Sequence, residues 1–214
     1  MAAILFLVVL LLAPFLSHAS DPDPLMDFCI AEPDSSPSFA SFPCKPASNV
    51  TSEDFFFNGF MNEGDTSSSP YRSKVTPGNV LTFPGLNTLG ISMNRVDLAI
   101  NGMNPPHSHP RSSEVGVVIS GKVLVGFVTT GNVYYSKVLI PGQMFVIPRG
   151  LVHFQKNVGE TKALVFTAFN SQNPGVVILA TTLFATKPPI PDDVLSQNFQ
   201  VDSNVIHEIE SKFG

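Results

Sequence analysis

Apolar and polar residues alternate over much of the chain between residues 89 and 184, in short segments about ten positions apart. Turn residues separate the segments, as at Ser120-Gly121 and Pro141-Gly142. Such alternation is typical of strands that are buried on one face only. The pattern predicts an all-β fold, an antiparallel sandwich or barrel, with strands within 89–100, 114–130, 132–150, 163–169 and 175–184.

The amino-terminal region has a different texture. Ala2–Leu16 is apolar and uncharged, but at about 1.5 Å per residue it is shorter than a bilayer core of roughly 30 Å. Ser17-His18-Ala19 then has the pattern of a cleavage site. We interpret residues 1–19 as a secretory signal peptide, with a membrane anchor as the alternative. The prolines that follow predict an extended arm over residues 20–60.

Short helices are predicted in the carboxyl-terminal segment, residues 187–214. Asp192 and Asp202 stand at positions suited to cap helix starts. The last helix would carry four apolar residues on one face: Val205, Ile206, Ile209 and Phe213. That face could pack on the barrel of its own chain or in a groove of a partner.

Composition and charge exclude several classes of protein. The 214 residues include 12 Lys and Arg against 17 Asp and Glu, so the formal net charge is -5. An acidic chain lacks the positive surface that nucleic-acid binding requires. No later stretch is apolar for long enough to span a membrane. We therefore expect neither a nucleic-acid nor a membrane partner, and a core large enough to fold without a metal.

Secretion changes the interpretation of the two cysteines. Cys29 and Cys44 would pass through an oxidising compartment, which favours a disulfide between them over two separate buried thiols. Asn49-Val50-Thr51 matches the N-glycosylation sequon, so Asn49 is a candidate glycosylation site.

Two histidines and a glutamate form a candidate metal-binding group. His107 and His109 are two positions apart, so on a strand both imidazoles project to the same side. Glu114 is an odd number of positions from His109 and would face away on a regular strand. We therefore predict an irregularity near Pro110 that redirects the Glu114 carboxylate.

His153 would complete the group from a separate strand, after the turn at Pro148-Arg149-Gly150. Three imidazoles and one carboxylate suit Mn, Fe, Ni, Cu or Zn, and in an octahedral site they leave two positions for water, substrate or dioxygen. A single histidine is commonly a core or surface residue, so the prediction depends on the four residues together.

Several segments carry a resemblance to a known family. PPHSHPRSSE and GQMFVIPRGLVHFQKN resemble the two cupin boxes, and the second fits Gly-x5-Pro-x-Gly-x2-His-x3-Asn from Gly142 to Asn157. The chain more narrowly resembles the germins and germin-like proteins of plants. The supporting segments are SDPDPLMDFC (20–29), NTLGISMNRVDLA (87–99), FNSQNPGVV (169–177) and KPPIPDDVL (187–195).

This resemblance implies a single cupin jelly-roll β-barrel over residues 61–186, assembled into a hexamer as a trimer of dimers. It also implies one manganese ion per chain, secretion to the apoplast or cell wall, and a connection with plant defence. The counterparts of the manganese ligands in this sequence are His107, His109, Glu114 and His153.

The resemblance leaves three activities open. In germins that oxidise oxalate with dioxygen, asparagines matching Asn94 and Asn104 orient the substrate, and an amide NH2 can donate to a carboxylate. Without the resemblance, Asn104 would be a turn residue and Asn94 an exposed strand position. Superoxide dismutation and a non-enzymatic wall or receptor role are the alternatives. The departures at 100–102, 129–132 and Lys156 leave oxalate turnover undecided.

Overall fold

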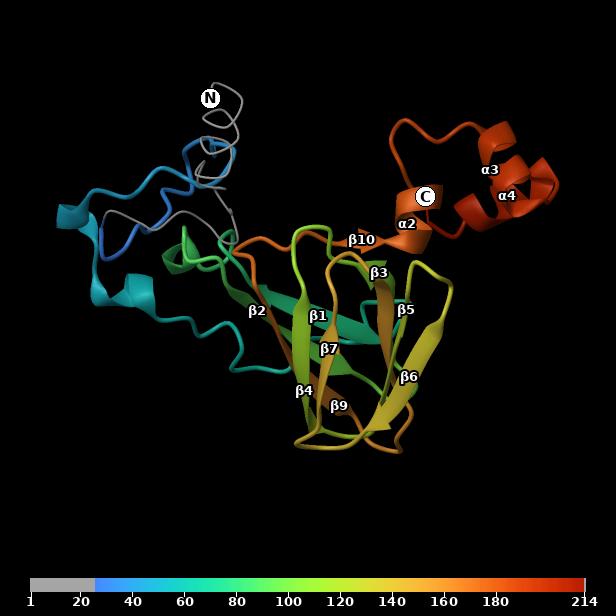
Figure 1. Ribbon diagram of the computed structural model, residues 1–214, viewed down its shortest axis with the longest axis horizontal. Helices are drawn as coiled ribbons and strands as arrows, with labels where there is room; N and C mark the ends of the chain where they lie inside the picture. The colour runs from blue at the N-terminus through green and yellow to red at the C-terminus, as the bar shows by residue number, and fades with distance from the viewer. Residues whose placement is uncertain (1–25, 214) are drawn as a thin grey trace, which may run out of the picture.

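The computed structural model describes residues 26–213, and its centre is a barrel formed by two five-stranded antiparallel sheets (Figure 1). The first sheet has the order β1-β2-β9-β4-β7 and the second has the order β10-β3-β8-β5-β6. The predicted all-β barrel is therefore confirmed. The strands are β1 (Ser73–Gly78), β2 (Ser92–Leu98), β3 (Met103–Ser108), β4 (Glu114–Ser120), β5 (Val123–Val128), β6 (Tyr134–Leu139), β7 (Met144–Ile147), β8 (Val152–Asn157), β9 (Ala163–Phe169) and β10 (Val177–Ile178).

Alternation along these strands builds the core between the two sheets. In β9 every second residue from Ala163 to Phe169 is buried, which is the pattern expected of a half-buried strand. Valines from both sheets, among them Val118, Val123 and Val165, have at most 1% of their surface exposed. Burial of this apolar surface stabilises the barrel and holds its strands in register.

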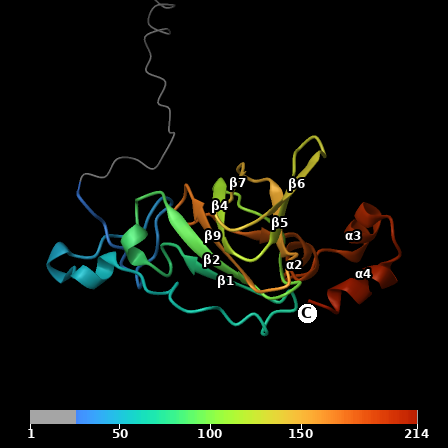
Figure 2. The same ribbon diagram turned by 90° about the horizontal axis from the view of Figure 1, so that it is seen from below.

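The arm and the carboxyl-terminal helices lie at opposite sides of the barrel (Figures 1 and 2). The arm contains a disulfide between Cys29 and Cys44, so the predicted pairing is confirmed. The short helices of this side of the molecule are η1 (Ala47–Asn49), η2 (Ser52–Phe55) and η3 (Pro84–Leu86). The predicted signal peptide, residues 1–19, lies outside the described residues.

The predicted strand over residues 175–184 is wrong for most of its length. Only Val177–Ile178 forms a strand, and Leu179–Phe184 forms helix α2. A short apolar run has no period that separates a strand from a buried helix, so packing decides. Here the ring of Phe184 stacks on Phe199 at 5.5 Å between centroids, against the helices that follow. Strand β1, which includes Pro77 at the edge of its sheet, was not predicted.

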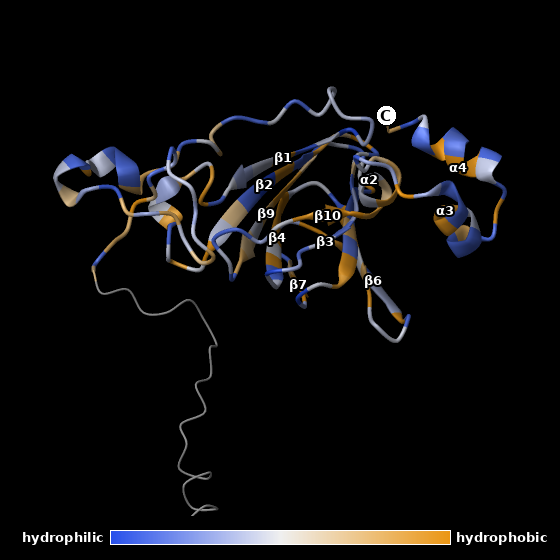
Figure 3. Ribbon diagram, turned by 90° about the horizontal axis from the view of Figure 1, so that it is seen from above, coloured by the Kyte–Doolittle hydropathy of each residue, from blue (hydrophilic) through white to orange (hydrophobic). Residues whose placement is uncertain are grey.

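The two predicted carboxyl-terminal helices are α3 (Asp192–Phe199) and α4 (Ser203–Glu210). They pack on each other and α4 also contacts α2, with Ile206 fully buried and Val205 41% exposed. His207 Nε2 and Asp192 Oδ2 join them at 2.6 Å on an exposed surface. Figure 3 shows apolar and polar segments on both helices, and the pair stands beside the barrel rather than on its core.

Among the described residues, no helix is long and apolar enough to cross a membrane.

Candidate metal centre

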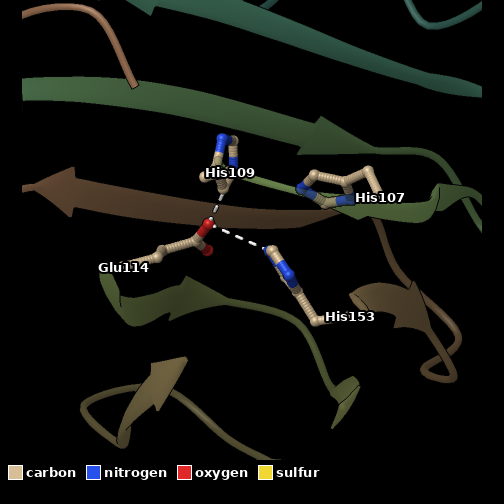
Figure 4. Close-up of side chains that lie close together, drawn as sticks. All are labelled: His107, His109, Glu114 and His153. Carbon is tan, nitrogen blue, oxygen red and sulfur yellow. Dashed lines mark hydrogen bonds and ion pairs between the residues drawn. The ribbon is translucent and has the colours of Figure 1, made fainter. Parts of the chain in front are cut away.

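Four side chains from both sheets meet inside the barrel (Figure 4). His107 belongs to β3 and His153 to β8, where the two residues are direct partners in the register. His109 follows the end of β3, and Glu114 begins β4 in the other sheet. All four residues are at most 5% exposed.

The chain brings Glu114 to the histidines by changing sheets. The predicted irregularity near Pro110 is present, but it is a turn between β3 and β4 and not a bulge within one strand. Because the two sheets face each other, a residue at the start of β4 can point back toward β3. The odd spacing from His109 to Glu114 therefore imposes no parity conflict.

The Glu114 carboxylate lies between His109 and His153 (Figure 4). Its Oε2 atom is 3.1 Å from His109 Nε2 and 3.1 Å from His153 Nε2. One nitrogen from each of the three histidines and one Glu114 oxygen all lie within 4.8 Å of one another. These atoms are close enough for a single ion to contact every one of them.

The other nitrogen of each imidazole is held by the backbone. The Nδ1–H groups of His107, His109 and His153 donate to the carbonyl oxygens of Pro105 (2.7 Å), Gly175 (2.6 Å) and Leu151 (2.9 Å). A carbonyl oxygen can only accept, so these bonds set the tautomer and leave Nε2 as the free ligand atom.

With these tautomers, the Nε2 lone pairs of His109 and His153 face the Glu114 carboxylate. A neutral imidazole Nε2 and a Glu114 oxygen are both acceptors, so a contact of 3.1 Å between them requires a proton or a cation. A metal ion satisfies all four ligand atoms at once. The donor set of three imidazole nitrogens and one carboxylate oxygen fits a divalent first-row metal and leaves coordination positions open.

The protonation states agree with such a site. Burial and the neighbouring His153 lower the pKa of His107 to about 3, so its imidazole is neutral and able to bind a metal. Burial raises the pKa of Glu114, but the close approach of the His109 and His153 Nε2 atoms to its carboxylate outweighs burial and lowers this pKa to about 2, as positive charge shared between them would. Glu114 is therefore a carboxylate at neutral pH.

Comparison with known proteins agrees with this geometry. Residues 59–207 match the Cupin family. The chain is 54% identical over 208 residues to "Germin-like protein subfamily T member 2" of Arabidopsis thaliana, covering 97% of this chain and 93% of that protein. It is 53% identical over 217 residues to "Germin-like protein 3-7" of Oryza sativa subsp. japonica, covering 99% and 93%. The chain belongs to the germin-like family of cupins.

A solved structure of a related protein has the same fold. The structure described as "Oxalate oxidase in complex with substrate analogue glycolate" superimposes with a TM-score of 0.87 at 48% sequence identity. The match covers 91% of this germin-like chain and 98% of that chain.

Gln155 is part of the site and was missed by the sequence analysis. Its amide Nε2 donates to Glu114 Oε1 at 3.1 Å, and its Oε1 accepts from Asn104 Nδ2 at 2.7 Å. A chain of hydrogen bonds thus runs from Asn104 to the carboxylate. The sequence could have pointed to Gln155, because it lies two residues after His153 and alternate residues of a strand share a face. Both side chains are on the inward face of β8.

The two asparagines singled out from the sequence are placed differently. Asn104 faces the site because the β3–β8 register shifts between Asn104 and His107, which lets both residues face inward despite their odd spacing. Asn94 lies on β2 in the first sheet and is half-buried, on the same face as the buried Ser92. It is therefore not the exposed strand position that the pattern alone allowed.

Asn49 lies in η1 on the exposed surface of the arm, far along the chain from the four clustered residues. Its side chain is accessible in the way that a glycosylation site requires.

Proposed function

We propose that this germin-like protein binds one manganese ion at His107, His109, Glu114 and His153 and oxidises oxalate with dioxygen. The observation that carries the proposal is the buried group of three histidines and one carboxylate, connected through Gln155 to Asn104. The similarity to a solved oxalate oxidase supports the choice of substrate.

The overall reaction is oxalate dianion, dioxygen and two protons giving two carbon dioxide and hydrogen peroxide. The C–C bond of oxalate breaks, oxalate loses two electrons, and dioxygen accepts two electrons and two protons. When bound, manganese would supply an electrophilic centre that binds the anion and can change oxidation state. The barrel residues bury the reactants, and the amide NH2 groups of Asn94 and Asn104 would donate to carboxylate oxygens.

Superoxide dismutation is the second candidate, because it requires the four ligands and an open position but no amides to orient oxalate. Replacing Asn94 and Asn104 by Ala separates the two activities. Loss of oxalate-dependent peroxide with retained superoxide dismutation would fit the oxidase; equal loss of both would contradict the proposed role of the amides. A protein inactive in both assays would leave the non-enzymatic wall or receptor role.

We also propose that the protein assembles into a hexamer. An apolar patch supports this: Val115 and Val146 are paired across β4 and β7 and are 41% and 60% exposed, and the nearby Met144 is 66% exposed. An exposed patch of this kind is typical of a protein interface. In the assembly, the arm (20–60) and the helical segment (187–214) would extend from the barrel (61–186) toward neighbouring chains.

The remaining proposals concern the location of the protein. Removal of residues 1–19, glycosylation at Asn49 and export to the apoplast or cell wall would together place it where plant defence uses hydrogen peroxide. The disulfide between Cys29 and Cys44 supports an oxidising destination.

The first experiment is to measure the metal content of protein purified from a secreting plant host, with oxalate-dependent peroxide release assayed on the same sample. About one manganese per chain with peroxide release would support the oxidase. Manganese without oxalate turnover would favour superoxide chemistry or a binding role. Well-folded protein without metal would contradict the proposed ligand set.

A further inference from the structure

Thr167 occupies the row of residues next to Glu114 on the inner face of the first sheet. In the registers of β2, β9 and β4, Ser92, Phe169 and Glu114 form one row across the sheet. Asn94, Thr167 and Gly116 form the row two residues further along the three strands, with side chains on the same face. Thr167 therefore lies directly beside Asn94 and one row from Glu114.

The hydroxyl of Thr167 is buried without a partner. Thr167 is 2% exposed, and its Oγ1 atom has no hydrogen-bond partner among the described residues. A buried polar group left unpaired costs about 1–3 kcal/mol, so such groups require an explanation. Within residues 26–213, three other buried hydroxyls share this state but lie outside the strands of the barrel: Thr88, Thr186 and Ser196.

The neighbours of Thr167 along β9 show where its side chain lies within the barrel. The next inward residue along β9 is Val165, which is fully buried in the apolar core with Val96 and Val118. The opposite direction leads to the row of Glu114. Thr167 thus lies at the boundary between the apolar core and the metal centre, where a valine would pack equally well and a hydroxyl gains nothing from the protein itself.

The facing sheet supplies a matching polar row. Gln155 and Asn104 are register partners in β8 and β3, next to the row of His153 and His107. Their amides are bonded to each other and to Glu114, so their geometry is set. A small ligand at the metal centre would meet amide groups from the second sheet and, from the first sheet, Asn94 and the free hydroxyl of Thr167.

We propose that Thr167 is a specificity-determining residue whose hydroxyl donates a hydrogen bond to an oxygen of a small carboxylate bound at the metal centre. This inference rests on the proposed function, since it assumes a carboxylate ligand. The hydroxyl would favour ligands with an oxygen beyond those that contact the metal, as in oxalate or glycolate. A one-atom anion such as fluoride could bind the metal but could not contact the metal and the Thr167 hydroxyl at the same time.

The test compares Thr167→Val, which removes the hydroxyl at constant shape, with Thr167→Ser, which keeps it. Thr186→Val is the matched control, because it removes another unpartnered buried hydroxyl outside the barrel strands. Each full-length, manganese-loaded protein is titrated with glycolate and with fluoride, and water-proton relaxation follows displacement of metal-bound water. Metal content is measured on every sample.

We expect Thr167→Val to bind glycolate about tenfold or more weakly, the effect of losing one hydrogen bond to a charged group. Fluoride affinity and manganese content should stay unchanged, while Thr167→Ser and Thr186→Val should match the wild type within about twofold. Equal glycolate affinity in the wild type and Thr167→Val would overturn the inference and leave the proposed function standing. Loss of manganese from Thr167→Val would also overturn it, because the residue would then support the metal centre.

A wild-type protein that holds manganese but binds no glycolate would overturn the proposed carboxylate chemistry itself, and the role of Thr167 with it. The three failures are therefore distinguished by which measurement changes: the glycolate comparison between variants, the metal content, or glycolate binding by the wild type.

Discussion

Glu114 Oε2 lies 3.1 Å from His153 Nε2, although the two residues are 39 positions apart in sequence and belong to strands of different sheets. The Nδ1–H of His153 is already donated to Leu151, so the short contact joins two acceptors when the imidazole is neutral. The site is therefore arranged around a positive charge that the protein itself does not carry there. Several predictions about metal binding and stability depend on this contact.

Replacing Glu114 by Gln should weaken metal binding by at least tenfold, because the site loses its only negative ligand among the four while the three imidazoles remain. Metal content after dialysis against a buffer with low free manganese measures the effect. Glu160→Gln is the matched control, since Glu160 is exposed after β8 and lies outside the centre. Full metal occupancy in Glu114→Gln would contradict the role of the carboxylate.

Removal of the metal should lower the melting temperature. A ligand present at a thousand times its Kd stabilises the native state by about 4 kcal/mol, which for a chain of this length corresponds to roughly 8–16 °C. Differential scanning calorimetry before and after chelation measures the shift. Glu114→Gln should melt at the same temperature with and without chelator, and an equal chelator effect on both proteins would show that the stabilising metal binds elsewhere.

Replacing Gln155 by Leu should reduce metal affinity by about 10–100-fold, the usual effect of removing a group that orients a metal ligand. The substitution leaves Glu114 Oε1 and the Asn104 amide without their partner inside the barrel. Competition with a chelator of known affinity measures the change. Gln197→Leu, on the exposed side of α3, is the control and should bind metal like the wild type. A wild-type metal affinity in Gln155→Leu would mean that Glu114 binds the metal equally well without the hydrogen bond from Gln155.

Loss of the disulfide should destabilise the protein by about 3 kcal/mol, the value that the chain-entropy model gives for a loop of this size. The double variant Cys29→Ser/Cys44→Ser removes the crosslink with little change in volume. Urea denaturation under oxidising and reducing conditions measures the free energy of unfolding. A reducing agent should destabilise the wild type and leave the double variant unchanged.

A charge on the apolar patch should disrupt the proposed assembly. Val146→Asp places a carboxylate among Val115 and Met144, where burial in an interface would be costly. Light scattering should report a smaller particle than for the wild type. Val158→Asp, an equally drastic change at a 41% exposed position after β8, is the control. A wild-type monomer would refute the hexamer before any variant is made.

Much of the strand arrangement could be predicted from local pattern. The alternation in ALVFTAF and the turns at Gly121 and Gly142 locate β9, β5 and β7, because a strand buried on one face must alternate and a left-handed turn favours glycine. The run at 179–184 could not be assigned in this way. Its helical state follows from packing against the carboxyl-terminal helices, which local sequence does not encode.

The sequence by itself determined which residues could form the site, namely a His-x-His pair, a glutamate and a third histidine after a turn, and which two cysteines could pair in the arm. These are chemical identities and short spacings, which are local properties. Only the tertiary structure decided that the chain changes sheets between His109 and Glu114, that Gln155 bonds Glu114, and that Thr167 lies one row away. Those relations depend on strand register and on two sheets facing each other, and both are set by burial of the whole core and not by any one segment.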